Sequence, residues 1–414
     1  MDASRPGSPT RLIVPNSPNS SVGHRPLVRR TAVASGRHTG ALFCVARSVD
    51  VWDSIVIGAG QGGLAASYFL TQRKVTHLVL DGNPVAGGAW QHRWDSLTMH
   101  DVHGVADLPG ETAPARSADR ANVAVPNYFA DYEARHQLPI VRPVVVEEVT
   151  SEGELLVVRA SDGRAWRTRT LVNATGTWTR PNWPDYPGVD DFRGEQFHTA
   201  TYPGREHLRG KRIIVVGAGA SAVQFIGELA PIADVLWVTR RPPQWRTSDF
   251  GPQTGLEVVT EVEKRVVAGL PPISVVGATG LMLREQEQEA ARLGAFEDPL
   301  PIFERIVEGG AQWSDGVVEE ADVILWATGF RSAVDHLEPL GLRGPQGGIP
   351  LVRVEGNVQA ATTAALDPRV HLIGYGPSAS TIGASRAARR AAMEVAKKVA
   401  SPFGTSRNVS VGGG

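Results

Sequence analysis

Residues 54–63 read Ser-Ile-Val-Ile-Gly-Ala-Gly-Gln-Gly-Gly, an apolar strand that runs directly into a glycine-rich turn. Gly58, Gly60 and Gly63 hold the three glycine positions of a G-x-G-x-x-G turn, and helical apolar spacing follows over residues 64–70. The first glycine permits a tight bend, the second lets a pyrophosphate approach bare backbone, and the third lets helix and strand pack closely. The helix N-terminus adds unpaired N–H groups. The stretch predicts a dinucleotide site of the Rossmann type.

Asp81 ends the next apolar run, residues 77–80, about 20 residues beyond the turn as the dinucleotide fingerprint requires. A carboxylate at this position can accept hydrogen bonds from a ribose diol. Strand, turn, helix and strand together form a βαβ unit that feeds a parallel sheet, so the sequence predicts an α/β fold.

A second copy of the pattern lies further along the chain. The apolar run 213–216 leads into a turn in which Gly217 and Gly219 hold the first two glycine positions, Ser221 follows, and Ala222 replaces the third glycine. Alanine is still small enough for the close contact between helix and strand. We therefore predict two Rossmann-like dinucleotide-binding domains.

The second copy ends differently from the first. Arg240 and Arg241 follow its second apolar strand, where the first copy has a carboxylate. Two cations at this position favour the 2′-phosphate of NADPH over the free ribose of NADH. The alternative is a solvated basic turn with no role in binding.

Composition limits the possible functions. The chain has 414 residues, a hydrophobic fraction of 42% and a net charge of -1, which is enough for two ordinary cores and gives no bias toward nucleic acid. No apolar run approaches the roughly 20 residues that cross a membrane, so we expect a cytoplasmic protein without an integral membrane segment. Cys44 is the only cysteine, and this excludes a dithiol relay.

Two unequal nucleotide sites imply a division of labour, in which one site holds a flavin that takes hydride and the other a nicotinamide that gives it. Two further motifs carry a resemblance. Gly87-Gly88-Ala89-Trp90 resembles the G-G-x-W of class B flavin monooxygenases, the flavin-containing and Baeyer–Villiger enzymes. Residues 192–202 fit the F-x-G-x-x-x-H-x-x-x-aromatic pattern of that family, with His198 as its histidine. The resemblance covers roughly residues 52 to 400 and implies FAD and NADPH as cofactors.

The resemblance also implies a domain plan and further cofactor contacts. The FAD-binding domain is expected over 51–180 and 328–402, with the NADPH-binding domain, 181–327, inserted into it. Residues 1–50, which are rich in Ser, Pro, Gly and Arg, are expected to be a disordered extension or a transit peptide, and 403–414 a flexible tail. Cofactor contacts are implied for the G-G-x-W motif, for two A-T-G segments that link the domains, and for a C-terminal flavin segment: Gly88, Trp90, Gly176, Thr328, Gly329, Gly374 and Thr381.

His198 and His103 are the candidate catalytic residues. Without the family, His198 is better interpreted as a hydrogen-bonded structural residue, and within the family its motif governs domain linkage and nicotinamide placement more than proton transfer. His100, Asp101 and His103 are candidate acid/base groups or metal ligands, with ordinary polar satisfaction as the alternative. No matching cluster elsewhere completes a metal site, so no metal is predicted.

The resemblance implies that the enzyme inserts one oxygen atom from O2 into a small organic substrate through a flavin hydroperoxide. Residues 97–103 lack the Asn associated with heteroatom oxygenation and an obvious Arg of the Baeyer–Villiger type, so the exact chemistry stays open. The alternatives are an NADPH:acceptor oxidoreductase or oxidase without oxygen insertion, and a flavin-binding redox sensor without turnover. The sequence predicts neither the substrate nor the oligomeric state.

Overall fold

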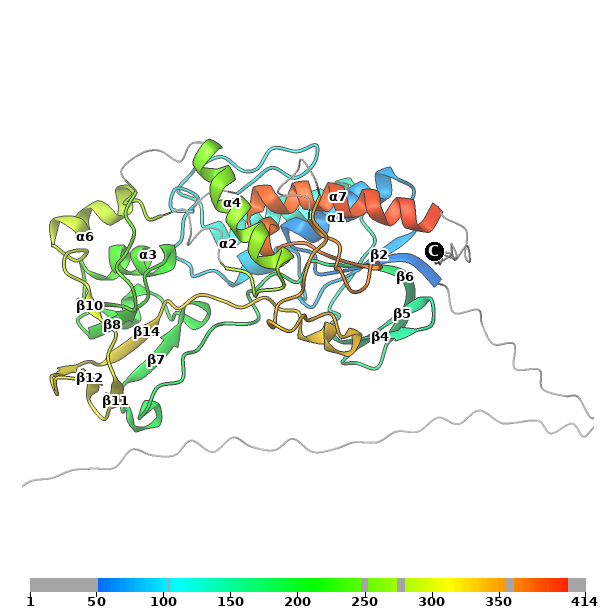
Figure 1. The fold of residues 1–414 in the computed structure, drawn as a ribbon. Helices are drawn as coiled ribbons and strands as arrows, with labels where there is room; N and C mark the ends of the chain where they lie inside the picture. The colour runs from blue at the N-terminus through cyan, green and yellow to red at the C-terminus, as the bar shows by residue number, and fades with distance from the viewer. Residues whose placement is uncertain (1–50, 103–104, 247–251, 274–279, 355–360, 401–414) are drawn as a thin grey trace, which may run out of the picture. The chain divides into compact units, whose positions relative to one another are not determined.

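The computed structural model describes residues 51–102, 105–246, 252–273, 280–354 and 361–400. The extension 1–50, the tail 403–414 and His103 lie outside the described residues. Two sheets, one mixed and one parallel, organise the described part of the chain (Figure 1). One glycine-rich turn follows β1 of the first sheet, and the other follows β8 of the second. The α/β class is confirmed.

The first sheet has strand order β3-β2-β1-β6-β5-β4, and its first four strands are parallel. β15 pairs in parallel with the second half of β6, and β5 and β4 add antiparallel strands at the other half. β5 and β6 form a hairpin that turns at Asp162 and Gly163. The strands are β1 (Val51–Ile57), β2 (His77–Leu80), β3 (Ile140–Val141), β4 (Val146–Glu152), β5 (Leu155–Ala160), β6 (Ala165–Asn173) and β15 (Val370–Leu372).

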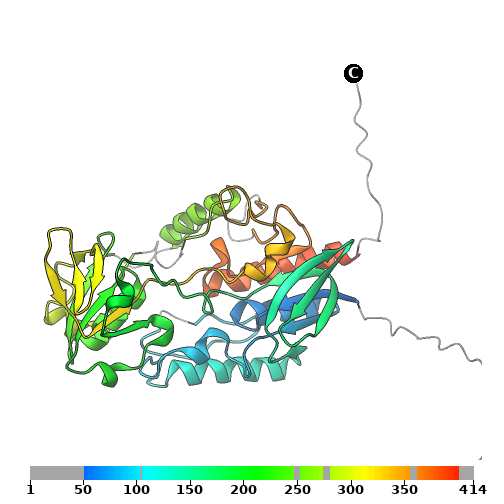
Figure 2. The same cartoon turned by 90° about the horizontal axis from the view of Figure 1, so that it is seen from below.

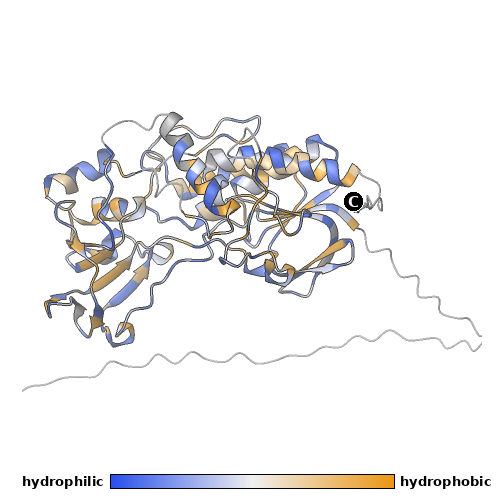
Figure 3. Cartoon of the chain, in the orientation of Figure 1, coloured by the Kyte–Doolittle hydropathy of each residue, from blue (hydrophilic) through white to orange (hydrophobic). Residues whose placement is uncertain are grey.

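Helices cover this sheet. α1 (Gln61–Gln72) and α7 (Thr381–Ala400) lie side by side in both views (Figures 1 and 2) and contact each other, and α2 (Ala121–Arg135) packs near them. The contact is close because the facing residues are small, and these are fully buried: Ala65, Ala66, Ala387, Ala388 and Ala391. Hydrophobic and hydrophilic segments alternate along α7 in Figure 3, as expected of a helix with one buried side.

The second sheet is wholly parallel, with order β10-β9-β8-β14-β7. Its strands are β7 (Glu195–His198), β8 (Arg212–Val216), β9 (Asp234–Thr239), β10 (Leu300–Pro301) and β14 (Val323–Trp326), so all of them fall between β6 and β15 in sequence. An antiparallel sheet, order β11-β12-β13, consists of β11 (Arg305–Val307), β12 (Gly310–Gln312) and β13 (Val318–Glu320).

The remaining helices are α3 (Ala220–Leu229), which follows β8, α4 (Pro252–Val267) and the short α6 (Gln288–Arg292). The short 3-10 turns are η1 (Gly88–His92), η2 (Val189–Asp191), η3 (Thr199–Thr201), η4 (Arg205–Leu208), η5 (Glu285–Glu287), η6 (Asp335–Leu340) and η7 (Gly376–Ser378). Within the described ranges, no helix is both long and apolar enough to cross a membrane.

Candidate functional site

The first glycine turn has the shape of a phosphate cradle. Gly58 has φ +95°, and a Cβ there would lie 2.6 Å from the carbonyl oxygen of Ala174, at the end of β6. A Cβ on Gly63 would lie 1.8 Å from the carbonyl oxygen of Gly58. At Gly60, by contrast, a Cβ would meet no heavy atom within 4 Å. The first and third glycines are thus required by packing, and the second faces open space at the N-terminus of α1, which fits a pyrophosphate.

The second turn repeats this arrangement. Gly217 has φ +147°, and a Cβ there would lie 2.4 Å from the carbonyl oxygen of Ala327, at the end of β14. A Cβ on Gly219, at the N-terminus of α3, would again meet nothing within 4 Å. Ala222 is completely buried on α3, and Ser221 lies in the same first turn of the helix. The two turns therefore share both the tight contact and the open position.

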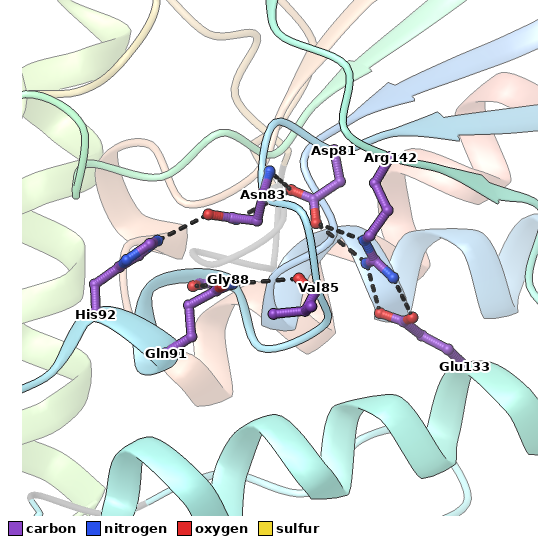
Figure 4. A network of polar contacts seen from close by, with 8 residues as sticks. All are labelled: Asp81, Asn83, Val85, Gly88, Gln91, His92, Glu133 and Arg142. Atoms are coloured by element: carbon purple, nitrogen blue, oxygen red, sulfur yellow. Dashed lines mark hydrogen bonds and ion pairs between the residues drawn. The ribbon is translucent and has the colours of Figure 1, made fainter. Parts of the chain in front are cut away.

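The end of β2 holds a buried carboxylate (Figure 4). Asp81 is 2% exposed, and its Oδ2 accepts a hydrogen bond of 3.2 Å from Nε of Arg142. Arg142 also donates two hydrogen bonds to Glu133, and these raise the pKa of the guanidinium above its ordinary value. The side-chain amide of Asn83 donates to Oδ1 of Asp81 at 3.2 Å. Asp81 is held in place at the carboxyl edge of the sheet, where the ribose of a dinucleotide is expected.

The end of β9 carries positive charge, whereas the end of β2 carries a carboxylate. Arg240 and Arg241 are exposed, and neither forms an ion pair with a carboxylate in the part of the chain that the structure describes. Burial raises the pKa of Tyr186, and the positive charge of nearby Arg240 works against that rise. Two cations at this position would attract a dianionic phosphate.

The G-G-x-W motif packs directly on the first cradle. Gly88 has φ +52°, and a Cβ there would lie 2.9 Å from Cα of Gly60. Trp90 is partly buried against the core that surrounds α1. The motif therefore forms one wall beside the open position at Gly60.

The two A-T-G segments are tied to the chain that passes beside them. The backbone N–H of Asn182 donates to the carbonyl of Gly329 at 2.9 Å, and the Thr328 hydroxyl donates to the carbonyl of Asn182 at 2.6 Å. The first A-T-G segment accepts a hydrogen bond in turn: the N–H of Ala333 donates to the carbonyl of Gly176 at 3.0 Å. The two connections between the sheets, residues 174–183 and 327–333, thus form a hydrogen-bonded pair that we call the linker pair.

His198 closes β7 against this linker pair and has no exposed surface. Its Nδ1 accepts a hydrogen bond from the backbone N–H of Ala200 at 3.1 Å, so the ring proton belongs on Nε2, which lies 3.0 Å from the carbonyl oxygen of Gly329. Burial lowers the pKa of His198 below its ordinary value. The ring of Phe330 packs edge-on at 5.0 Å. Both nitrogens of the neutral imidazole hold backbone groups in place.

The other candidates occupy different surroundings. His100 is exposed, and Asp101 accepts a hydrogen bond of 2.5 Å from the Thr98 hydroxyl. No group of three His, Cys, Asp or Glu side chains suited to a metal ion occurs among the described residues. Gly374, φ +75°, approaches Gly176 to 3.9 Å, measured from the position of an added Cβ, and Thr381 begins α7. The C-terminal segment therefore reaches the first A-T-G segment.

Sequence patterns did not point to Arg93, Trp178 or Asn182. Arg93 lies over the rings of Trp90 and Trp178, at 5.6 and 4.4 Å from their centroids, and Asn182 organises the linker pair. Arg93 directly follows the G-G-x-W turn, which is the one local signal that would have drawn attention to it.

Comparison with known proteins shows which family the chain resembles. Residues 55–271 match the family model described as "Pyridine nucleotide-disulphide oxidoreductase". The structure of a flavin-containing monooxygenase from Stenotrophomonas maltophilia is 33% identical, with TM-score 0.72, and the match covers 84% of this chain and 99% of that one. Indole-3-pyruvate monooxygenase YUCCA1 of Oryza sativa subsp. japonica is 26% identical over 70% of this chain and 79% of its own length.

A third match extends the likeness of the fold. Cyclohexanone monooxygenase from Rhodococcus sp. Phi1, in a crystal structure bound to NADP+, has TM-score 0.55 at 20% identity, and the match covers 85% of each chain. The fold and the paired glycine turns define a flavoprotein oxidoreductase with two dinucleotide-binding units. The chain belongs to the flavin monooxygenase family, and it uses FAD and NADPH.

Proposed function

We propose that the β1–α1 turn holds the pyrophosphate of FAD, that the β8–α3 turn holds that of NADPH, and that the enzyme inserts one oxygen atom from O2 into a small organic substrate. The observation that carries the proposal is the repeated cradle. In both turns a tight glycine abuts an alanine carbonyl while the next glycine, Gly60 or Gly219, faces open space. Two such cradles in one chain match a flavin and a nicotinamide that must exchange hydride.

The ends of the second strands support our assignment of one cofactor to each unit. Asp81, fixed by Arg142, suits a ribose diol, which is neutral and donates hydrogen bonds. Arg240 and Arg241 suit the 2′-phosphate that distinguishes NADPH from NADH. We accordingly assign residues 51–180 and 328–402 to FAD and residues 181–327 to NADPH.

When bound, FAD supplies the capacity to accept hydride from NADPH and to activate O2. The residues of the chain position and shield this chemistry. Trp90 and the linker pair lie beside the first cradle, and apolar and aromatic groups there exclude water that would divert the reaction to hydrogen peroxide. We assign His198 a positioning role, because its ring joins the end of β7 to Gly329 in the second A-T-G segment.

The test is isotopic. Purified enzyme is given NADPH, labelled O2 and a panel of amines, sulfides, ketones and carboxylic acids, and the label is sought in the organic product. One labelled oxygen atom per NADPH consumed is the expected result for the true substrate. Recovery of all the electrons as hydrogen peroxide across the panel would contradict oxygen insertion. We also propose a cytoplasmic location, on the basis that charged residues interrupt every apolar stretch.

A further inference from the structure

Arg93 is a partly buried cation enclosed by aromatic rings. Its guanidinium carbon lies 4.4 Å from the ring centroid of Trp178 and 5.6 Å from that of Trp90. Trp178 in turn stacks on Phe330 at 5.0 Å, with an interplanar angle of 24°. Arg93 therefore lies between the G-G-x-W motif and the linker pair.

No carboxylate neutralises this cation in the part of the chain that the structure describes. Asp95, two residues away, pairs with Arg120 at 3.3 Å and accepts from the Asn122 amide at 2.8 Å. Nε of Arg93 is buried and has no hydrogen-bond partner among the described residues. Burial lowers the pKa of the guanidinium to about 10, and no anion among the described residues counters this shift. A desolvated charge without a counterion is costly, so the site favours an anionic ligand.

The geometry restricts how such a ligand would bind. A guanidinium is planar, and its faces stack on aromatic rings while its N–H groups point outward in the plane. With Trp178 against one face, the edges of Arg93 are the part suited to hydrogen bonding. A carboxylate or phosphate can meet such an edge with two parallel hydrogen bonds.

The phosphates of the cofactors already have sites of their own. Each pyrophosphate has an open cradle, at Gly60 or Gly219, and the 2′-phosphate has Arg240 and Arg241. Arg93 lies in neither glycine turn: it follows the G-G-x-W motif beside the first cradle, and its aromatic partner Trp178 lies in the linker pair, which connects the two units. The unpaired cation is thus left for a third anion, supplied by the molecule that is oxygenated.

We propose that Arg93 binds a carboxylate group of the substrate, so that the enzyme oxygenates small organic carboxylic acids. The assignment of a substrate rests on the proposed monooxygenase function, whereas the binding of the acid does not. Arg93 is then a residue that determines substrate specificity: it contributes to binding of the acid and has no part in hydride transfer.

The test compares acids with ketones that lack only the carboxylate. The probes are phenylpyruvate against phenylacetone, and pyruvate against acetone, titrated calorimetrically into FAD-loaded enzyme. The enzyme should bind the acid of at least one pair about ten- to hundredfold more tightly than its ketone, the range for charge-assisted hydrogen bonds. Arg93→Gln should remove that preference, and Arg93→Lys should retain part of it.

Arg73→Gln is the matched control, because Arg73 is also partly buried and lies 5.8 Å from an aromatic ring, that of Phe69, at the far end of α1. It should leave the preference unchanged. FAD content and NADP+ affinity are measured in each variant. Absence of any preference in the unmodified enzyme overturns the proposal, and so does an Arg93→Gln protein that keeps the preference or instead loses FAD or NADP+. Labelled-oxygen incorporation is scored separately, so failure of oxygenation and failure of acid binding are distinguishable.

Discussion

The two glycine turns differ little in backbone and strongly in the charge at the end of the next strand. Both place a tight glycine against an alanine carbonyl, 2.6 Å from the position of a Cβ at Gly58 and 2.4 Å at Gly217. The first unit ends in Asp81, buried and held by Arg142, whereas the second ends in two exposed arginines. Packing therefore fixes the shape of the turn in both units, and we propose that the side chains after the second strand select the nucleotide.

The largest expected effect comes from the third glycine position, where the turns differ by one methyl group. In Gly63→Ala the new Cβ would collide with the backbone carbonyl of Gly58 at 1.8 Å, so we expect at least about 3 kcal/mol of destabilisation and loss of FAD. The converse change, Ala222→Gly, should cost about 1 kcal/mol through helix propensity alone. Thermal unfolding and FAD content measure both. Equal effects of the two changes would contradict the packing argument.

The buried carboxylate gives an effect of similar size. Arg142→Met leaves Asp81 and Glu133 without their shared cation, and removal of one partner from a buried ion pair costs about 3–5 kcal/mol. FAD affinity should fall with stability. Arg240→Met, an exposed site on the other unit, should leave the free energy of unfolding within about 0.5 kcal/mol. Denaturant unfolding measures the free energy of unfolding of both variants. An Arg142→Met protein as stable as the unmodified enzyme would show that Asp81 does not depend on Arg142.

Acid should weaken the first unit through buried histidines. His371 on β15 is 1% exposed, and burial lowers its pKa from 6.5 to about 4. Since the folded state disfavours the proton, stability is unchanged above pH 6.5 and falls as pH drops from 6.5 toward 4, on the order of 3 kcal/mol for this group. His371→Leu should flatten the decline in a pH series of unfolding measurements. An identical slope in both proteins would remove His371 as a cause.

The smallest effect concerns the choice of nicotinamide nucleotide. Arg240→Gln and Arg241→Gln should each lower kcat/KM for NADPH about tenfold, equivalent to about 1.4 kcal/mol, and leave the value for NADH nearly unchanged. Steady-state kinetics give kcat/KM for both nucleotides in each variant. Equal losses with NADH and NADPH would favour a general effect over recognition of the 2′-phosphate.

Local patterns predicted both parallel βαβ units, because apolar strands and glycine turns are encoded within short windows. The strands β11, β12 and β13 are three residues each and too short to give a periodic pattern. Single positions were also placed by local pattern: Gly60 faces open space at the start of α1, and Asp81 ends β2 as a buried carboxylate. Their contacts with a cofactor stay predictions. The stacking of Arg93 on Trp178 joins segments far apart in sequence and depends on tertiary packing, which no local pattern encodes.

The second glycines offer the most direct test of the two-cradle account, because both lie in open space and have extended backbone that any residue adopts: φ -82° at Gly60 and -109° at Gly219. A valine at either position should therefore fold normally and fill the place of a pyrophosphate. FAD content and NADP+ affinity are measured in Gly60→Val and Gly219→Val. We expect a crossed result, in which Gly60→Val loses FAD and Gly219→Val keeps FAD but loses NADP+. A folded Gly60→Val protein with full FAD, or a Gly219→Val protein with normal NADP+ affinity, would contradict it.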